Sequence, residues 1–166
     1  MIVRKARAFL AAVVEALDRA ASLVVILAMA TLTVVIILQV VMRYGFNSSL
    51  DWGWEVPRLC FIGTIFLALP LGLKSGAHVA ITFLITRVGE RGRIALVLFQ
   101  TVLSILLMGI VAVFGLLLTL DLWDQMMPTL NLSIGVFYAI VTFSAVHSIL
   151  HLLNGALVAT PQQILE

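Results

Sequence analysis

The sequence has little charge. Only 11% of its 166 residues are Asp, Glu, Lys or Arg, whereas 63% are hydrophobic. Soluble domains carry about 25% charged residues, so this composition excludes an ordinary soluble globular domain. The net charge of +2 is small and the basic residues are scattered, which gives no indication of a nucleic-acid surface. We therefore predict a single membrane domain over residues 1–166.

The residue patterns that perform catalysis are also scarce. The single cysteine, Cys60, excludes an intrachain disulfide framework and a relay between paired thiols. The sequence contains no Gly-rich phosphate loop, no nucleophile with an accompanying base, and no Cys or His cluster with the spacing of a closed metal site. We therefore expect that the protein is not an enzyme and that it has no cofactor and no metal site.

Long runs without charge predict an all-α protein with four transmembrane helices. Two of these runs cover residues 20–42 and 94–120, and the first is roughly 34 Å long as a helix, enough for a hydrocarbon core of about 30 Å. A third helix is expected over 133–159, capped by Asn131 or Ser133 and ending before Pro161.

The remaining span, at 54–74, is less obvious. Its charge-free part runs only from Leu59 to Leu73, which is shorter than the ~20 residues that a span needs. The helix reaches a sufficient length if Arg58 and Lys74 extend toward opposite interfaces and the helix begins near Trp52. Pro70 predicts a kink in this helix, because proline removes a backbone donor.

The basic residues favour a cytoplasmic location for both termini. The N-terminal arm holds Arg4, Lys5, Arg7 and Arg19, and the loop between the second and third spans holds Lys74, Arg87, Arg91 and Arg93. The opposite side has Arg43 and Arg58 alone. The positive-inside rule then predicts an N-in, C-in topology with segment 43–58 on the outer side. Arg87, Arg91 and Arg93 are expected to meet lipid headgroups.

The N-terminal arm is amphipathic. Apolar residues recur at three- and four-residue spacing at Ile2, Ala6, Phe9, Val13 and Leu17. Charged residues, Asp18 among them, lie mostly elsewhere on the helical wheel. This pattern predicts a helix lying in the cytoplasmic interface. A simple extension of the first span fits the same pattern equally well.

A polar stripe follows the fourth span. Its members share one helical face and are Ser144, His147, Ser148, His151 and Asn154. One interpretation is b-haem ligation by His147 or His151 together with His78, as in a membrane anchor of a respiratory oxidoreductase. The other is packing against a neighbouring helix, a common role of polar side chains in membranes. Packing is favoured, because haem ligands need matching depths on facing helices.

The third span carries small residues, and the spans carry almost no charge. Gly109, Ala112 and Gly115 share a face suited to close helix packing. Apart from Arg58 and Lys74, no predicted span contains a formal charge, whereas ion pathways usually require one. A self-sufficient small exporter is therefore disfavoured.

The segment between the first two spans concentrates charge and tryptophan. Trp52, Glu55 and Arg58 follow one another at three-residue steps, so on a helix they share a face and Glu55 can pair with Arg58. Arg43, at the end of the first span, is expected to join Glu55 or Asp51. The functional interpretation is a charge network that docks a partner or holds the corner between the spans. The alternative is an ordinary interfacial set with a Trp anchor.

Three spaced blocks resemble a known family. They are Arg43-Tyr-Gly-Phe-Asn47, then Ser49-Leu-x-Trp52-x-x-Glu55-x-x-Arg58 followed by Gly63, and finally Lys74-x-Gly76-Ala77-His78-Val79. Together they resemble the small membrane subunit (Q-type, DctQ-like) of tripartite ATP-independent periplasmic (TRAP) transporters. The resemblance covers roughly residues 40–85. The sequence departs from it at Trp54, where many relatives have a second acid.

The resemblance implies a role in a heteromeric transporter of the bacterial inner membrane. In this family a periplasmic binding protein delivers an organic acid to a large membrane subunit, which imports it with a sodium gradient. The small subunit braces the large one and has no catalytic centre. By resemblance, the outer structural corner comprises Arg43, Trp52, Glu55 and Arg58, and the cytoplasmic end of the second span comprises Lys74 and His78.

Overall fold

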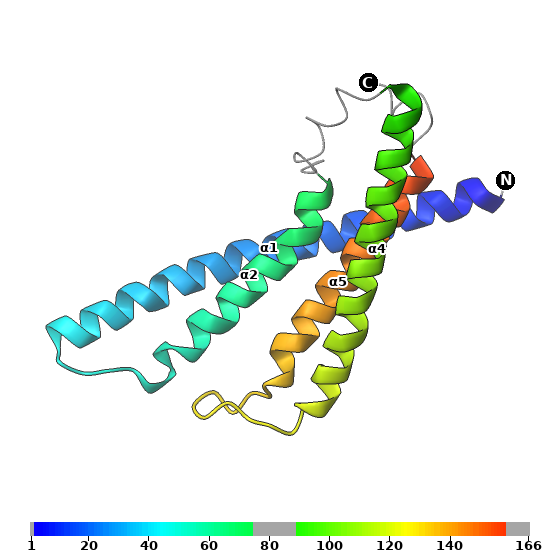
Figure 1. Cartoon of the computed structure of the whole chain (residues 1–166). Helices are drawn as coiled ribbons and strands as arrows, with labels where there is room; N and C mark the ends of the chain where they lie inside the picture. The colour runs from blue at the N-terminus through cyan, green and yellow to red at the C-terminus, as the bar shows by residue number, and fades with distance from the viewer. Residues whose placement is uncertain (1, 75–88, 159–166) are drawn as a thin grey trace.

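The computed structural model describes residues 2–74 and 89–158. Within these ranges the elements are α1 (Ile2–Gly45), a short 3-10 turn η1 (Asp51–Gly53), α2 (Glu55–Lys74), α4 (Glu90–Asp121) and α5 (Gly135–Val158) (Figure 1). Stretches long and apolar enough to cross a membrane occur at Ala11–Gly45, Asp51–Leu73, Ile94–Asp121 and Gly135–Gly155. The predicted all-α class with four spans is confirmed.

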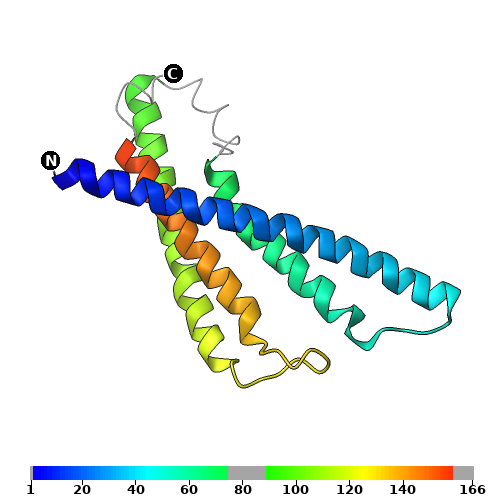
Figure 2. The same cartoon turned by 180° about the vertical axis from the view of Figure 1, so that it is seen from behind.

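The helices form two hairpins that meet along α5. Helices α1 and α2 pack together, as do α4 and α5, and α5 also contacts both α2 and α1. Among the helices of the described ranges, α4 contacts only α5. Seen from behind, α1 crosses over α5 and continues along α2 (Figure 2). The chain is therefore an open arrangement centred on α5 rather than a closed bundle.

Helix α1 is a single element that includes the N-terminal arm. The N-terminal arm and the first span form one uninterrupted helix, and the location of the arm in the cytoplasmic interface stays a prediction. Residues 2–44 contain no Gly and no Pro, so nothing in the sequence interrupts the helix. The part of α1 that is buried within the chain contains Val14, Asp18 and Ala21.

Helix α2 continues past a buried proline with help from α5. Pro70 has no N–H to donate to the carbonyl of Phe66, four residues earlier. The hydroxyl of Ser144 on α5 donates a hydrogen bond to this same carbonyl. An unpaired carbonyl is costly in a membrane, so this bond joins α2 to α5 where the helix is weakest.

The α4–α5 hairpin depends on one close approach and one cap. A Cβ on Gly115 would lie 2.6 Å from Oγ1 of Thr142 on α5, whereas a Cβ on Gly109 would meet nothing within 4 Å. Of the two glycines in the predicted small-residue face, only Gly115 approaches α5 closely. At the start of α5, the Ser133 hydroxyl accepts a hydrogen bond from the Gly135 N–H at 3.0 Å. Ser133 is thus the capping residue.

Candidate functional site

Two loops meet at one end of the molecule. The loop that joins α1 to α2 and the loop that joins α4 to α5 both lie at the lower end in Figure 1. Gly53 of the first loop is buried, and a Cβ there would approach Nε2 of Gln39 on α1 to 3.0 Å. The absence of a side chain at this position therefore lets the loop fold closely onto α1. We call this end, comprising residues 43–58 and 122–134, the outer corner, after the side of the membrane that the basic residues predict for it.

Glu55 joins the two hairpins at the outer corner. Its side chain is on the first residue of α2 and is 1% exposed. The carboxylate accepts hydrogen bonds from the N–H of Leu130 at 2.9 Å and from the N–H of Thr129 at 3.2 and 3.3 Å. Backbone donors and the positive end of a helix both stabilise a buried carboxylate. Glu55 therefore connects α2 to the loop between α4 and α5.

Arg58 does not pair with Glu55. Its guanidinium lies over the ring of Phe137 on α5, at 5.2 Å from the ring centroid. Within residues 2–74 and 89–158, no ion pair involves Arg58 or Arg43, and Arg43 is exposed. The predicted ion-pair network at this corner is therefore wrong. The partners of Glu55 are instead two backbone N–H groups of the loop between α4 and α5. The spacing of charged residues in the sequence could not reveal such uncharged partners.

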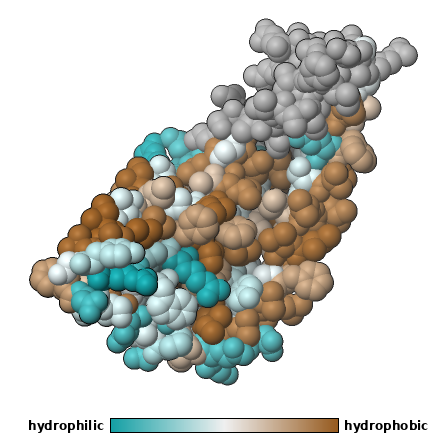
Figure 3. All heavy atoms as spheres, turned by 60° about the vertical axis from the view of Figure 1, so that its left-hand side comes forward, coloured by the Kyte–Doolittle hydropathy of each residue, from teal (hydrophilic) through white to brown (hydrophobic). Residues whose placement is uncertain are grey.

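Aromatic and polar side chains surround the outer corner. Trp52 is 37% exposed and Trp54 is 51% exposed. Figure 3 shows polar side chains gathered over this end, with apolar surface along the helices that lead away from it. Tryptophan at such a boundary is typical of the interface between membrane and water. The partial exposure of Trp52 leaves its ring accessible to the membrane interface or to a partner.

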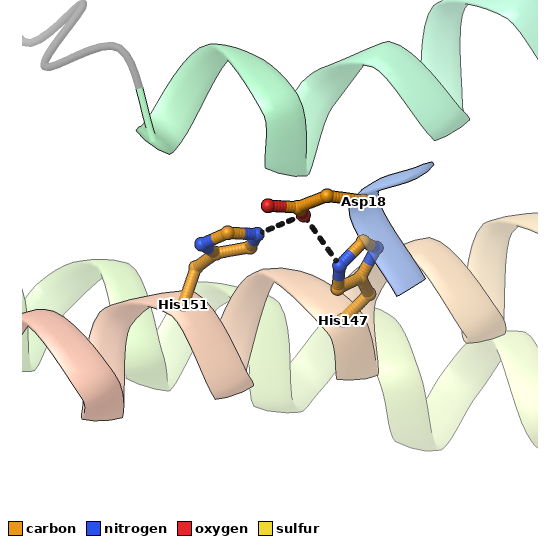
Figure 4. A group of neighbouring side chains, drawn as sticks. All are labelled: Asp18, His147 and His151. Carbon is orange, nitrogen blue, oxygen red and sulfur yellow. Dashed lines mark hydrogen bonds and ion pairs between the residues drawn. The ribbon is translucent and has the colours of Figure 1, made fainter. Parts of the chain in front are cut away.

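A second polar cluster lies where α1 crosses α5. Nε2 of His151 is 2.6 Å from Oδ1 of Asp18, and Nε2 of His147 is 3.1 Å from the same oxygen (Figure 4). All three side chains are buried, with an exposed fraction of 6% for Asp18, 1% for His147 and 8% for His151. The imidazole centroids are 5.0 Å apart. The polar stripe of α5 is thus in contact with another helix, as the packing interpretation predicted.

Asp18 is the functional candidate that the sequence interpretation missed. It lies just before the charge-free run and was assigned to the polar side of the amphipathic arm. In the structure it faces inward within a continuous α1. The available signal was its place four residues after Val14 and three before Ala21, on one helical face. The two histidines direct their Nε2 atoms at this carboxylate.

The other predicted residues remain predictions. Lys74 is the last residue of α2, and Arg91 and Arg93 belong to the first turn of α4. His78 and Arg87 lie outside the described residues.

An apolar groove separates α2 from α4. It has a volume of about 480 Å³ and lies over α5, with Arg58 and Phe137 among its lining residues. Most of the chain's apolar surface also faces outward. Only 6% of the most apolar window of α1 and of α4 is buried within the chain, against 28% for α5. These surfaces are available to lipid or to a partner protein.

Comparison with known proteins assigns a family. Residues 32–160 match the family described as tripartite ATP-independent periplasmic transporters, DctQ component. A Haemophilus influenzae protein assigned as a TRAP transporter small permease is 29% identical over 131 residues, covering 78% of this chain and 79% of the relative. The sialic acid TRAP transporter small permease protein SiaQ of Vibrio cholerae is 30% identical over 87 residues, covering 52% of this chain and 50% of the relative.

Proposed function

Because the chain belongs to the family of DctQ components of tripartite ATP-independent periplasmic transporters, we propose that it braces a large membrane subunit during solute import. Membership makes the chain a small permease subunit and a multi-pass protein of the bacterial inner membrane. The family is one of transporter subunits and not of enzymes. What we propose beyond this membership is the partner of the chain, the driving force of transport and the class of solute.

The distribution of polar contacts supports a bracing role. The polar side chains that join helices, Glu55, Ser144 and Asp18, form bonds within the chain. The most apolar windows of α1 and α4 are only 6% buried within the chain. A subunit that held solute or ions would be expected to direct polar groups into a pathway. This chain instead stabilises its own shape and presents apolar surface that a many-span partner would cover.

Membership of the family supports the partner and the solute that we propose. We propose that the large subunit imports an organic acid with a sodium gradient and receives it from a periplasmic binding protein. The name of the Vibrio cholerae relative includes sialic acid, which is an organic acid. In the N-in, C-in topology that the basic residues favour, the outer corner faces the periplasm. There it would contribute to the surface on which the binding protein docks.

The proposal can be tested by reconstitution. The chain and its large subunit would be purified together in mild detergent and placed in liposomes, with the binding protein and a panel of labelled organic acids outside. We expect uptake that requires an inward sodium gradient and falls when the small subunit is omitted. Equal uptake without the small subunit would contradict the bracing role. Co-purification with a haem-containing oxidoreductase instead would contradict the assigned partner.

A further inference from the structure

We propose that Asp18, His147 and His151 form a binding site for a divalent transition-metal cation of the Zn²⁺ type, which would bridge α1 and α5. The inference concerns this chain alone and does not depend on the solute or on the driving force of transport. It would add a metal-dependent connection between the two hairpins, at a distance from the outer corner.

The three ligand atoms are already close together. One ligand atom from each residue lies within 4.8 Å of the other two. Tetrahedral Zn²⁺ with bonds of about 2.0–2.1 Å places its ligand atoms roughly 3.3 Å apart. The observed separations of Oδ1 from the two Nε2 atoms are 2.6 and 3.1 Å. Side-chain shifts of under about 1 Å would therefore suffice for these pairs.

The helix backbone holds the two histidines in a suitable arrangement. His147 and His151 are four residues apart on α5, so both imidazoles project from the same face. Two histidines at this spacing on a helix are the ligand pair of many zinc sites. Asp18 reaches them from a different helix, as Figure 4 shows. The carboxylate is thus supplied by α1, and metal binding would require that α1 remain docked on α5.

A pocket provides access to the cluster. It has a volume of about 240 Å³ and is lined by Ala11, Val14, Glu15, Asp18, His151 and Asn154. Since Asp18 and His151 both form part of its wall, a cation can reach them from this side. A zinc site with three protein ligands keeps a fourth position for water, which the pocket would supply.

The ligand set indicates the class of metal. Imidazole nitrogen suits Zn²⁺, Cu²⁺, Ni²⁺ and Fe²⁺, whereas Ca²⁺ and Mg²⁺ prefer oxygen ligands alone. Two imidazoles and one carboxylate therefore favour a transition metal over the abundant alkaline-earth cations. Zn²⁺ is the simplest candidate, because it accepts mixed N and O ligands in a tetrahedral site without redox chemistry.

The test uses the full chain purified with its large subunit through an affinity tag that contains no histidine. After chelator treatment, Co²⁺ is titrated while its visible absorption is recorded, and Zn²⁺ is then added as a competitor. We expect saturable binding of one Co²⁺ per chain, displacement by Zn²⁺ and no displacement by excess Mg²⁺. Asp18→Asn and His151→Ala should each weaken binding at least about tenfold, since even supporting residues contribute that much.

The matched control is Asp121→Asn, which removes an exposed carboxylate at the end of α4 without touching the cluster. This variant should bind Co²⁺ like the wild type. Absence of saturable binding to the wild type, or equal binding by Asp18→Asn, His151→Ala and the wild type, would overturn the proposal. Should the variants not fold, zinc-edge X-ray absorption of the wild-type complex decides: imidazole scattering supports the site and oxygen ligation alone contradicts it.

Discussion

Replacement of Glu55 by alanine should separate the two hairpins at the outer corner. The carboxylate is 1% exposed and accepts hydrogen bonds from the backbone N–H groups of Thr129 and Leu130. A hydrogen bond to a charged group contributes about 1.5–3 kcal/mol. Thr129 is exposed, so water can replace the carboxylate at its N–H, whereas Leu130 is only half-exposed. We therefore expect Glu55→Ala to lower the free energy of unfolding by roughly 2–4 kcal/mol.

Glu55→Gln should have a smaller effect. Its amide oxygen keeps the size of the side chain and one acceptor but loses the charge, so we expect a loss of about 1 kcal/mol. Asp51→Asn is the matched control, because it neutralises an exposed acid four residues earlier; we expect a change below about 0.5 kcal/mol. Thermal unfolding of the detergent-purified chain ranks the three variants by stability. Hydrogen exchange at the N–H groups of Thr129 and Leu130 shows whether the loss of stability arises at the Glu55 contact.

The reasoning would be refuted if Glu55→Ala unfolded at the same temperature as Asp51→Asn and left hydrogen exchange in the α4–α5 loop unchanged. A double-mutant cycle with Arg58→Ala adds a second check. Since Arg58 contacts Phe137 and not Glu55, the two substitutions should be additive within about 0.5 kcal/mol. A coupling energy well above 1 kcal/mol would indicate that Glu55 and Arg58 do form the ion pair that the sequence spacing predicted.

Two further substitutions test the packing of α5 against its neighbours. Ser144→Ala should lower the free energy of unfolding by about 1 kcal/mol, because it leaves the Phe66 carbonyl without a donor. This loss should be smaller in a Pro70→Ala background, where residue 70 supplies its own N–H. An equal loss in both backgrounds, measured by thermal unfolding, would contradict the role of the bond. Gly115→Ala should destabilise the α4–α5 hairpin by about 1–3 kcal/mol, because the new Cβ meets a threonine of α5. Gly109→Ala is the control and should be neutral or stabilising, because its Cβ meets nothing within 4 Å. Similar unfolding temperatures for the two variants would show that α4 does not approach α5 at Gly115.

The comparison of sequence and structure is most instructive at Asp18. Both the charge pattern and the apolar stripe assigned it to the polar side of an interfacial helix. That assignment used the helical wheel of the arm alone, whereas packing against α5 buries the face of α1 that holds Asp18. Asp18 lies on the face of α1 that crosses α5, where the histidine stripe supplies partners. Local periodicity could identify the helical face that holds Asp18 and the one that holds the two histidines, but it could not predict that α1 crosses α5 at these residues.

The sequence by itself determined the class of protein. The charge-free runs required helices that cross a membrane, because each peptide group must find its hydrogen-bond partner within the helix. The motif blocks between residues 40 and 85 indicated the family, and the match over residues 32–160 confirms it.

Only the tertiary structure decided which polar groups meet. Glu55 is bound by backbone N–H groups 74 and 75 residues away, and Asp18 is bound by side chains 129 and 133 residues away. A backbone donor has no signature in the sequence, since every residue except proline carries one. The partner of a buried polar side chain therefore depends on how the hairpins dock, and this docking is determined by packing across the whole chain.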